Sequence, residues 1–139
     1  MKTLFLLLII TMCSPAYANM PSLKPCPDKP NCVSSKADDE HAIAPFKLKQ
    51  NQPVDQQRLL EVLNQLDNNI AVIHDENHIH AEITSRVFGF VDDLDLIINI
   101  EQQIIHVRSA SRTGYYDFGV NRRRVERLRS LLKQHGIIL

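Results

Sequence analysis

The spacing of apolar residues changes along the chain and predicts two helices with a sheet between them. Leu59, Leu63 and Leu66 fall on one helical stripe, which predicts a helix over residues 54–66. Asn68-Asn69 then supplies a stop, because asparagine favours turns over helix interiors. The strands of the predicted sheet begin directly after this stop.

Four strand-like runs follow, separated by short polar turns. Short connections imply an antiparallel meander, because parallel neighbours need long crossovers. In the second run Ile79, Ala81 and Ile83 alternate with polar residues, so one face of the sheet is apolar and the other polar. The four runs are Ile70–His74, His78–Ser85, Val91–Ile100 and Ile104–Ala110.

The third and fourth runs predict a specific register. A two-residue loop at Glu101-Gln102 sets Ile98 opposite Ile105 and Leu96 opposite Val107 on the apolar face. On the polar face the same register sets Asp95 opposite Arg108, an opposite-charge pair that contributes up to about 1 kcal/mol. The apolar side chains of both runs then share one face, so the register is self-consistent.

The chain closes with a second amphipathic stretch, residues 121–136, with Gly136 as its C-terminal stop. Its buried stripe is predicted to comprise Val125, Leu128, Leu131 and Leu132. The predicted fold class is therefore α+β: a four-stranded antiparallel meander with both helices on its apolar face.

An irregular segment is expected before this core. Residues 19–52 contain Pro21, Pro25, Pro27, Pro30 and Pro45 and show no sustained period of 2 or 3.6. We predict a strap laid over the domain, so that residues 19–52 and 53–139 form a single domain.

The first residues have the pattern of a secretory signal peptide. Lys2 is followed by an unbroken apolar run from Leu4 to Ile10 and by a small-residue exit, so cleavage is expected after Ala18. A lipid anchor on Cys13 is the alternative, although Met12 stands where a small residue is normally required. The mature protein is expected to be periplasmic or secreted and to have no transmembrane segment.

Removing Cys13 leaves an even pair, Cys26 and Cys32, in an oxidising compartment. A thiol nucleophile needs a base held beside it, and a redox pair more often has the shorter Cys-x-x-Cys spacing. The pair therefore favours a structural disulfide that closes a proline-bounded loop.

Charge is balanced overall, with 16 basic and 16 acidic side chains, and this argues against nucleic acid as a partner. Arginines nevertheless crowd the last third of the chain, around a strand-to-helix turn rich in capping side chains. Free N–H groups at a helix start and arginine forks both favour anions, which predicts an anion site there. Its candidate residues are Ser109, Ser111, Arg112, Asp117, Asn121, Arg122 and Arg124. In the competing interpretation, Asp117 caps the helix and pairs with Arg112, and the other arginines are solvated.

The polar face of the sheet is a second candidate surface. It is predicted to gather His80, Glu82, Asp92, Asp93, Asp95, His106 and Arg108. The histidines at positions 74, 78 and 80 invite a metal interpretation, but no fourth ligand has the spacing of a closed site. We therefore expect no metal and no cofactor.

Three blocks of sequence carry a family resemblance. They are CPDKPNCVSSKADDEHAIAPF from Cys26 to Phe46, FVDDLDLII near Phe90, and SASRTGYYDFGVNRRRVERLR from Ser109 to Arg129. Together they resemble a widespread bacterial family of unknown function, DUF1499, over nearly the whole mature chain. Tyr115 and Tyr116 stand where that family often has a more polar residue. The resemblance implies relatives but no reaction.

Two function classes follow from these patterns. The first is an exported binding or accessory protein that recognises a small anionic ligand or an anionic envelope component through Arg112, Arg122 and Arg124. The second is a small periplasmic hydrolase or transferase that uses Asp92, Asp93, His106 or Asp117. A closed pocket with a histidine and a carboxylate in hydrogen-bond reach favours the enzyme, and an open basic groove favours binding.

Overall fold

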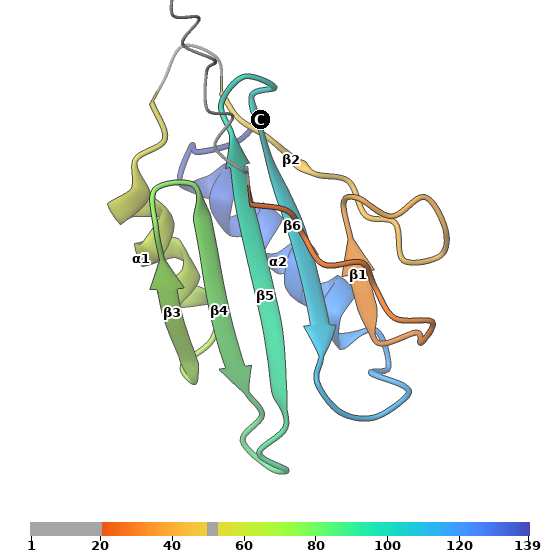
Figure 1. Cartoon of the computed structure of the whole chain (residues 1–139). Helices are drawn as coiled ribbons and strands as arrows, with labels where there is room; N and C mark the ends of the chain where they lie inside the picture. The colour runs from red at the N-terminus through yellow and green to blue at the C-terminus, as the bar shows by residue number, and fades with distance from the viewer. Residues whose placement is uncertain (1–20, 50–52) are drawn as a thin grey trace, which may run out of the picture.

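A computed structural model describes residues 21–49 and 53–139 (Figure 1). The predicted signal peptide, its cleavage site and Cys13 lie outside the described residues. Within the described ranges, no helix is long and apolar enough to cross a bilayer.

The predicted helices and strands are present, with ends that shift by a residue or two. Two further short strands occur within the segment that was predicted to be irregular. In chain order the elements are β1 (Cys32–Ser34), β2 (Phe46–Lys47), α1 (Gln56–Leu66), β3 (Ile70–His74), β4 (His78–Thr84), β5 (Val91–Asn99), β6 (Ile104–Ser111) and α2 (Val120–Gln134).

The α+β class and the antiparallel meander are confirmed. The strand order is β1-β6-β5-β4-β3, and β2 pairs with the same edge of β6 as β1. The predicted register of β5 and β6 is also confirmed, with Leu96 opposite Val107 and Asp95 opposite Arg108. Because side chains alternate along a strand, this register decides which residues reach each face.

The sheet is wider than the predicted four strands. Cys32 pairs with Ala110 and Phe46 with Ile105, so the N-terminal segment extends the sheet beyond β6. β1 and β2 have three and two residues, which is too short to show a period of 2. Their neighbouring prolines also argue against a strand. The other described residues of this segment are irregular, as predicted.

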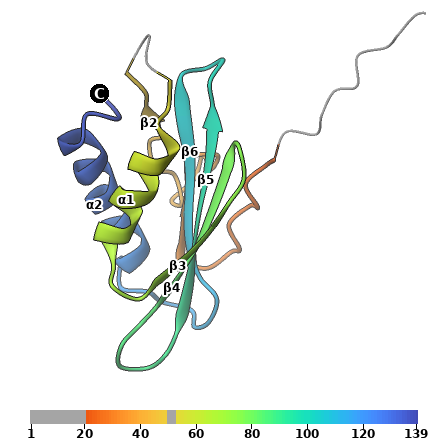
Figure 2. The same cartoon turned by 90° about the vertical axis from the view of Figure 1, so that its left-hand side faces the viewer.

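Both helices lie on one face of the sheet (Figure 2). Asp55 caps α1 by accepting a hydrogen bond from the backbone N–H of Arg58. Leu59 and Leu63 of α1 and Leu128 of α2 are fully buried, each contributing about 1.5–3 kcal/mol through burial. Both described helices therefore pack on the apolar face, and we call the opposite face of the sheet the outer face.

The predicted disulfide joins Cys26 to Cys32, with 5.7 Å between their Cα atoms. It ties the residues before β1 to the sheet edge. Figures 1 and 2 show this N-terminal stretch on the side of the sheet away from the helices. The described residues before β1 therefore cross the outer face, whereas the carbonyls of residues 40–45 in the same predicted strap bond to arginines of α2.

Candidate functional site

The arginines of the predicted anion site do not converge. Arg122 donates to the backbone carbonyls of Glu40 and Ala42, at 3.0 Å each. Arg124 pairs with Asp92 at 2.6 Å, and both side chains are largely buried. The Arg112 side chain instead turns to the outer face of the sheet.

The polar side chains at the same junction form a buried structural network centred on Asn121, which is fully buried. Its amide nitrogen donates to Ser111 Oγ at 2.9 Å and to Asp117 Oδ2 at 2.9 Å. Its amide oxygen accepts from Ser109 Oγ at 2.6 Å and from Arg124 at 2.7 Å. A ligand would have to break these bonds, so this network holds the turn rather than a ligand.

Asp117 acts as a cap for α2. Its carboxylate accepts hydrogen bonds from the backbone N–H groups of Gly119 at 2.7 Å and Asn121 at 3.1 Å. Arg112 forms no ion pair with it and bonds to Asp93 and Glu82 instead. The predicted cap by Asp117 is confirmed, and the predicted ion pair between Asp117 and Arg112 is wrong.

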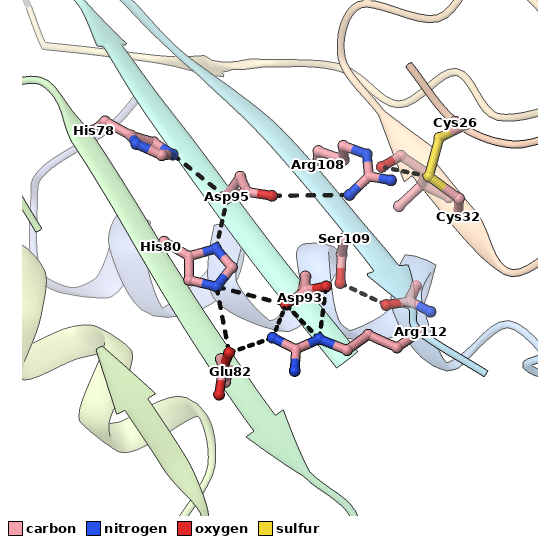
Figure 3. A network of polar contacts seen from close by, with 12 residues as sticks. Cys26, Cys32, His78, His80, Glu82, Asp93, Asp95, Arg108, Ser109 and Arg112 are labelled. Atoms are coloured by element: carbon pink, nitrogen blue, oxygen red, sulfur yellow. Dashed lines mark hydrogen bonds and ion pairs between the residues drawn. A yellow bond between two sulfur atoms is a disulfide. The ribbon is translucent and has the colours of Figure 1, made fainter. Parts of the chain in front are cut away.

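The second candidate surface is largely assembled on the outer face (Figure 3). Alternate positions of three neighbouring strands meet there, and Arg112 follows directly after β6. Asp92 does not belong to this surface, because its side chain lies on the helix side and pairs with Arg124. His74 is also separate, since it pairs with the inward-facing Ile79. The surface, hereafter the outer-face cluster, comprises His78, His80, Glu82, Asp93, Asp95, Arg108 and Arg112.

His80 is the centre of the outer-face cluster. Its Nδ1 lies 2.8 Å from Asp95 Oδ1. This contact holds the orientation of the ring, as carboxylates do for imidazoles in acid–base sites. Its Nε2 faces Asp93 at 3.5 Å and Glu82 at 3.8 Å. His78 Nε2 approaches the same Asp95 oxygen at 3.4 Å. The ring thus has the carboxylates of Asp95, Asp93 and Glu82 around it.

Arg112 balances two of these carboxylates. Its Nε and Nη2 contact Asp93 at 3.0 Å and 2.8 Å, and Nη2 also bonds to Glu82. The bonds to Asp93 and then to Glu82 raise the pKa of Arg112, which remains cationic at any physiological pH. The side chain is nevertheless accessible to solvent, and such an exposed fork can exchange partners.

Arg108 is different, because it is buried and almost unpartnered. The residue is 9% exposed. Its nearest carboxylate contact is Asp95 Oδ2, at 3.8 Å from Nη1. It donates no hydrogen bond to any described residue, and its buried Nε has no partner. A buried guanidinium normally has its donors satisfied, so these free donors suggest a missing acceptor.

A pocket of about 360 Å³ lies over Arg108 and the outer-face cluster. Residues Ser22, Leu23 and Lys24 of the strap form one wall, and Ser111 belongs to another. We call this space the outer-face pocket. It joins strap and sheet, a concave arrangement of the kind that binds small ligands.

His106 lies on the same face but outside this pocket. It is buried, its Nδ1 lies 3.3 Å from Ser35 Oγ, and its Nε2 has no partner among the described residues. Burial, followed by the positive charge of Lys36, lowers the pKa of the ring. His106 is therefore not part of the outer-face pocket.

Three side chains of the outer-face cluster could approach one cation. Ligand atoms of His80, Glu82 and Asp93 lie within 4.8 Å of one another. Arg112 already bonds to both carboxylates, so a metal ion would have to displace the guanidinium. The histidine set considered from sequence does not assemble, because His74 faces the other side of the sheet.

Three residues of the site, His78, Lys24 and Arg112, were not predicted to belong to this surface. Lys24 lies in the strap, whose path has no signature in the sequence. Arg112 was assigned to the helix junction, although it continues the alternation of Arg108 and Ala110 along β6 and so lies on their face. Extending the predicted strand by two residues would have revealed that parity.

Comparison with known proteins identifies relatives for nearly all of this fold. No curated protein and no solved structure matches the chain. The family model described as "Protein of unknown function (DUF1499)" matches residues 22–132, from the strap to the second half of α2. That range includes the disulfide, every strand and the outer-face pocket, and the chain accordingly belongs to the DUF1499 family.

Proposed function

We propose that this protein is an exported binding or accessory protein of the cell envelope that recognises an anionic group in the outer-face pocket. Arg108 carries this proposal, because it lines the pocket and its guanidinium donates no hydrogen bond to any described residue, so a bound carboxylate or phosphate would supply the acceptor. Arg112 and Lys24 add positive charge to the same space. Export rests on the sequence pattern of residues 1–18.

The charges around the pocket restrict the ligand further. Asp93 and Asp95 face the same space as the basic side chains, and Glu82 lies beside it, 3.8 Å from His80 Nε2. A bare anion would be repelled by these carboxylates, whereas hydroxyl or ammonium groups would donate to them. The best ligand therefore carries an anionic group for Arg108 and hydrogen-bond donors for the carboxylates. Sugar acids and small zwitterionic peptides have this chemistry.

A thermal-shift titration with glucuronate, D-alanyl-D-alanine and inorganic phosphate tests the proposal. Ligands that bind the native state raise the unfolding midpoint, by about 2.7 kcal/mol of stability at a hundredfold excess over Kd. We expect glucuronate or the dipeptide to exceed phosphate, since only they offer donors to the carboxylates.

Matched variants locate the binding. Arg108→Met should abolish the shift, whereas Arg58→Met, at an exposed position of α1 on the other face, should preserve it. Equal shifts in both variants, or no shift with any of the three probes, would contradict recognition through Arg108.

A second candidate function, acid–base hydrolysis or group transfer, is favoured by one observation. The 2.8 Å contact between His80 Nδ1 and Asp95 is the kind that orients a catalytic imidazole. Ester and phosphodiester substrates in a chromogenic assay test this function. An activity that His80→Gln and Asp95→Asn both remove would support it, and an activity unchanged by both variants would exclude the pair.

A further inference from the structure

Two neighbouring loops expose large apolar side chains at one end of the sheet. In the β4–β5 loop, Val87 is 82% and Phe88 is 74% exposed. In the β6–α2 loop, Tyr116 is 66% and Phe118 is 83% exposed. Single exposed apolar residues are ordinary, but several large ones gathered at one end of a molecule indicate an interaction surface.

The sheet register brings these loops together. Thr84 pairs with Val91 and Asp92 with Ser111, so β4 and β6 both end where β5 begins. The backbone N–H of Arg112 also bonds to the carbonyl of Val91 at 3.0 Å. Figures 1 and 2 show both loops at the same end of the molecule. We call this end the aromatic end; it comprises Val87, Phe88, Phe90, Tyr115, Tyr116, Phe118 and Val120.

The rings associate along the surface and do not fold into the core. The centroids of Phe88 and Phe90 lie 5.5 Å apart, and those of Tyr116 and Phe118 lie 6.3 Å apart. Phe118 holds this position with a φ of 53°, a left-handed conformation that bulky residues rarely adopt. The loop thus presents its phenylalanine to solvent despite an unfavourable backbone.

Positive charge surrounds the aromatic end. Arg86 lies between β4 and Val87, and Arg122, Arg123 and Arg127 lie on the first two turns of α2. None of the four forms an ion pair with a described residue, although Arg122 and Arg123 donate hydrogen bonds to backbone carbonyls. Asp117 is the one carboxylate within the two described loops, and capping bonds to α2 occupy its oxygens. The end is therefore apolar at its tip and cationic around it.

We propose that the aromatic end docks on an anionic phospholipid surface. Tyrosine and phenylalanine insert favourably at the level of the lipid headgroups, where apolar and hydrated regions meet. Arginines beside them attract anionic headgroups, with about 1 kcal/mol for each charge near the surface. The combination of unpaired arginines with exposed rings favours a lipid surface over a second copy of this chain, since two copies would bring like charges together.

The outer-face pocket then remains open on a docked molecule. Docking uses the loops at one end of the sheet, whereas the pocket lies on its outer face. The lipid proposal is thus independent of the proposed ligand, and either one can fail alone.

Tryptophan reporters provide a direct test, because the chain contains no tryptophan. Phe88→Trp and Phe118→Trp place one reporter in each loop, and Ile100→Trp places a control in the β5–β6 turn, at the opposite end of β5. Each variant is prepared as the chain from Asn19 to Leu139, which contains every described helix and strand. The probes are vesicles of phosphatidylglycerol mixed with phosphatidylcholine, and of phosphatidylcholine alone.

We expect both loop reporters to shift their emission to shorter wavelength with the anionic vesicles, and the Ile100→Trp control to stay unchanged. The double variant Arg86→Gln/Arg127→Gln should weaken vesicle binding about 25-fold, from two lost charges at about 1 kcal/mol each and 1.4 kcal/mol per tenfold. Neither arginine donates a hydrogen bond to a described residue, so the fold should be unaffected.

Three outcomes would overturn the proposal. They are emission unchanged in both loop reporters, an equal shift in the control, and binding unaffected by the arginine substitutions. Flotation of the unsubstituted chain with the same vesicles covers the case in which a reporter variant misfolds. A concentration-dependent dimer whose loop reporters are shifted without vesicles would assign the aromatic end to a second copy instead.

Discussion

Replacing Arg108 should leave the stability of the unliganded fold almost unchanged, although the side chain is buried. We consider Arg108→Met, which keeps an apolar stem of similar length and removes the guanidinium. Asp95 would keep His80 and His78 as neighbours, so the substitution does not leave a buried carboxylate alone. In an unliganded protein the guanidinium therefore contributes little that methionine cannot replace.

The magnitude follows from two opposing terms. An ion pair near 4 Å gains about 4 kcal/mol at an effective dielectric of about 20, and Arg108 lies 3.8 Å from Asp95. Removing a guanidinium from water costs several kcal/mol, and no hydrogen bond to a described residue offsets that cost here. The terms nearly cancel, so we expect the free energy of unfolding to change by no more than about 1 kcal/mol.

Arg124→Met is the matched control. The side chains of Arg108 and Arg124 are each 11% exposed, and both face an aspartate. Arg124 also bonds to Asn121 at 2.7 Å and to Asp92 at 2.6 Å. Its replacement leaves these buried partners unpaired and should lower the free energy of unfolding by about 3–5 kcal/mol.

Urea unfolding of both variants in ligand-free buffer measures the difference, with unchanged m-values as evidence that the two-state comparison holds. A loss in Arg108→Met as large as that in Arg124→Met would refute the reasoning. Such a result would mean that Arg108 stabilises the unliganded fold and is not held free for a ligand.

Three further predictions concern stability. Replacing Cys26 and Cys32 by serine should lower the free energy of unfolding by roughly 2 kcal/mol, the chain-entropy value for so short a loop, while ligand binding persists. Urea unfolding of both forms measures this loss, and a loss near zero would show that the loop is held by other contacts. Asn121→Leu should lower the free energy of unfolding by about 2–4 kcal/mol in the same assay, because it leaves buried donors and acceptors of the α2 junction unpaired. A loss below about 1 kcal/mol would contradict the structural role of that network. His106 should make stability fall as pH drops below about 6.5, because its folded-state pKa is lowered and the unfolded chain binds the proton more readily. Unfolding curves at pH 7.5 and pH 5 should therefore differ less in His106→Gln than in the unsubstituted chain, and an equal difference would exclude His106 as the cause.

Local periodicity explains why most of the fold was predictable from sequence. The leucines of α1 and the alternation in β4 and β5 each place their apolar set on one face, and the Glu101-Gln102 turn fixed the partner of Leu96. These features depend on residues close together in the chain. β1 and β2 have no such local signal, because they form only by pairing with β6 from far away in sequence.

The candidate site was predictable only in part, for the same reason. The strand parity of His80, Asp95 and Arg108 placed them correctly on one face. The backbone carbonyls that hold Arg122 lie about 80 residues away in sequence, so no local pattern could show that this arginine is already engaged. A cluster of arginines in sequence is therefore weak evidence for a cluster in space.

The Arg108 Nε–H resonance in a ¹H–¹⁵N NMR titration tests the central claim most directly. Arg108→Lys identifies this resonance by its disappearance, and glucuronate and D-alanyl-D-alanine serve as probes. We expect one of them to shift the Arg108 resonance saturably, together with backbone resonances of Leu23 and Lys24 in the pocket wall. Saturable shifts elsewhere that bypass Arg108, or no shift with either probe, would contradict an anion site in the outer-face pocket.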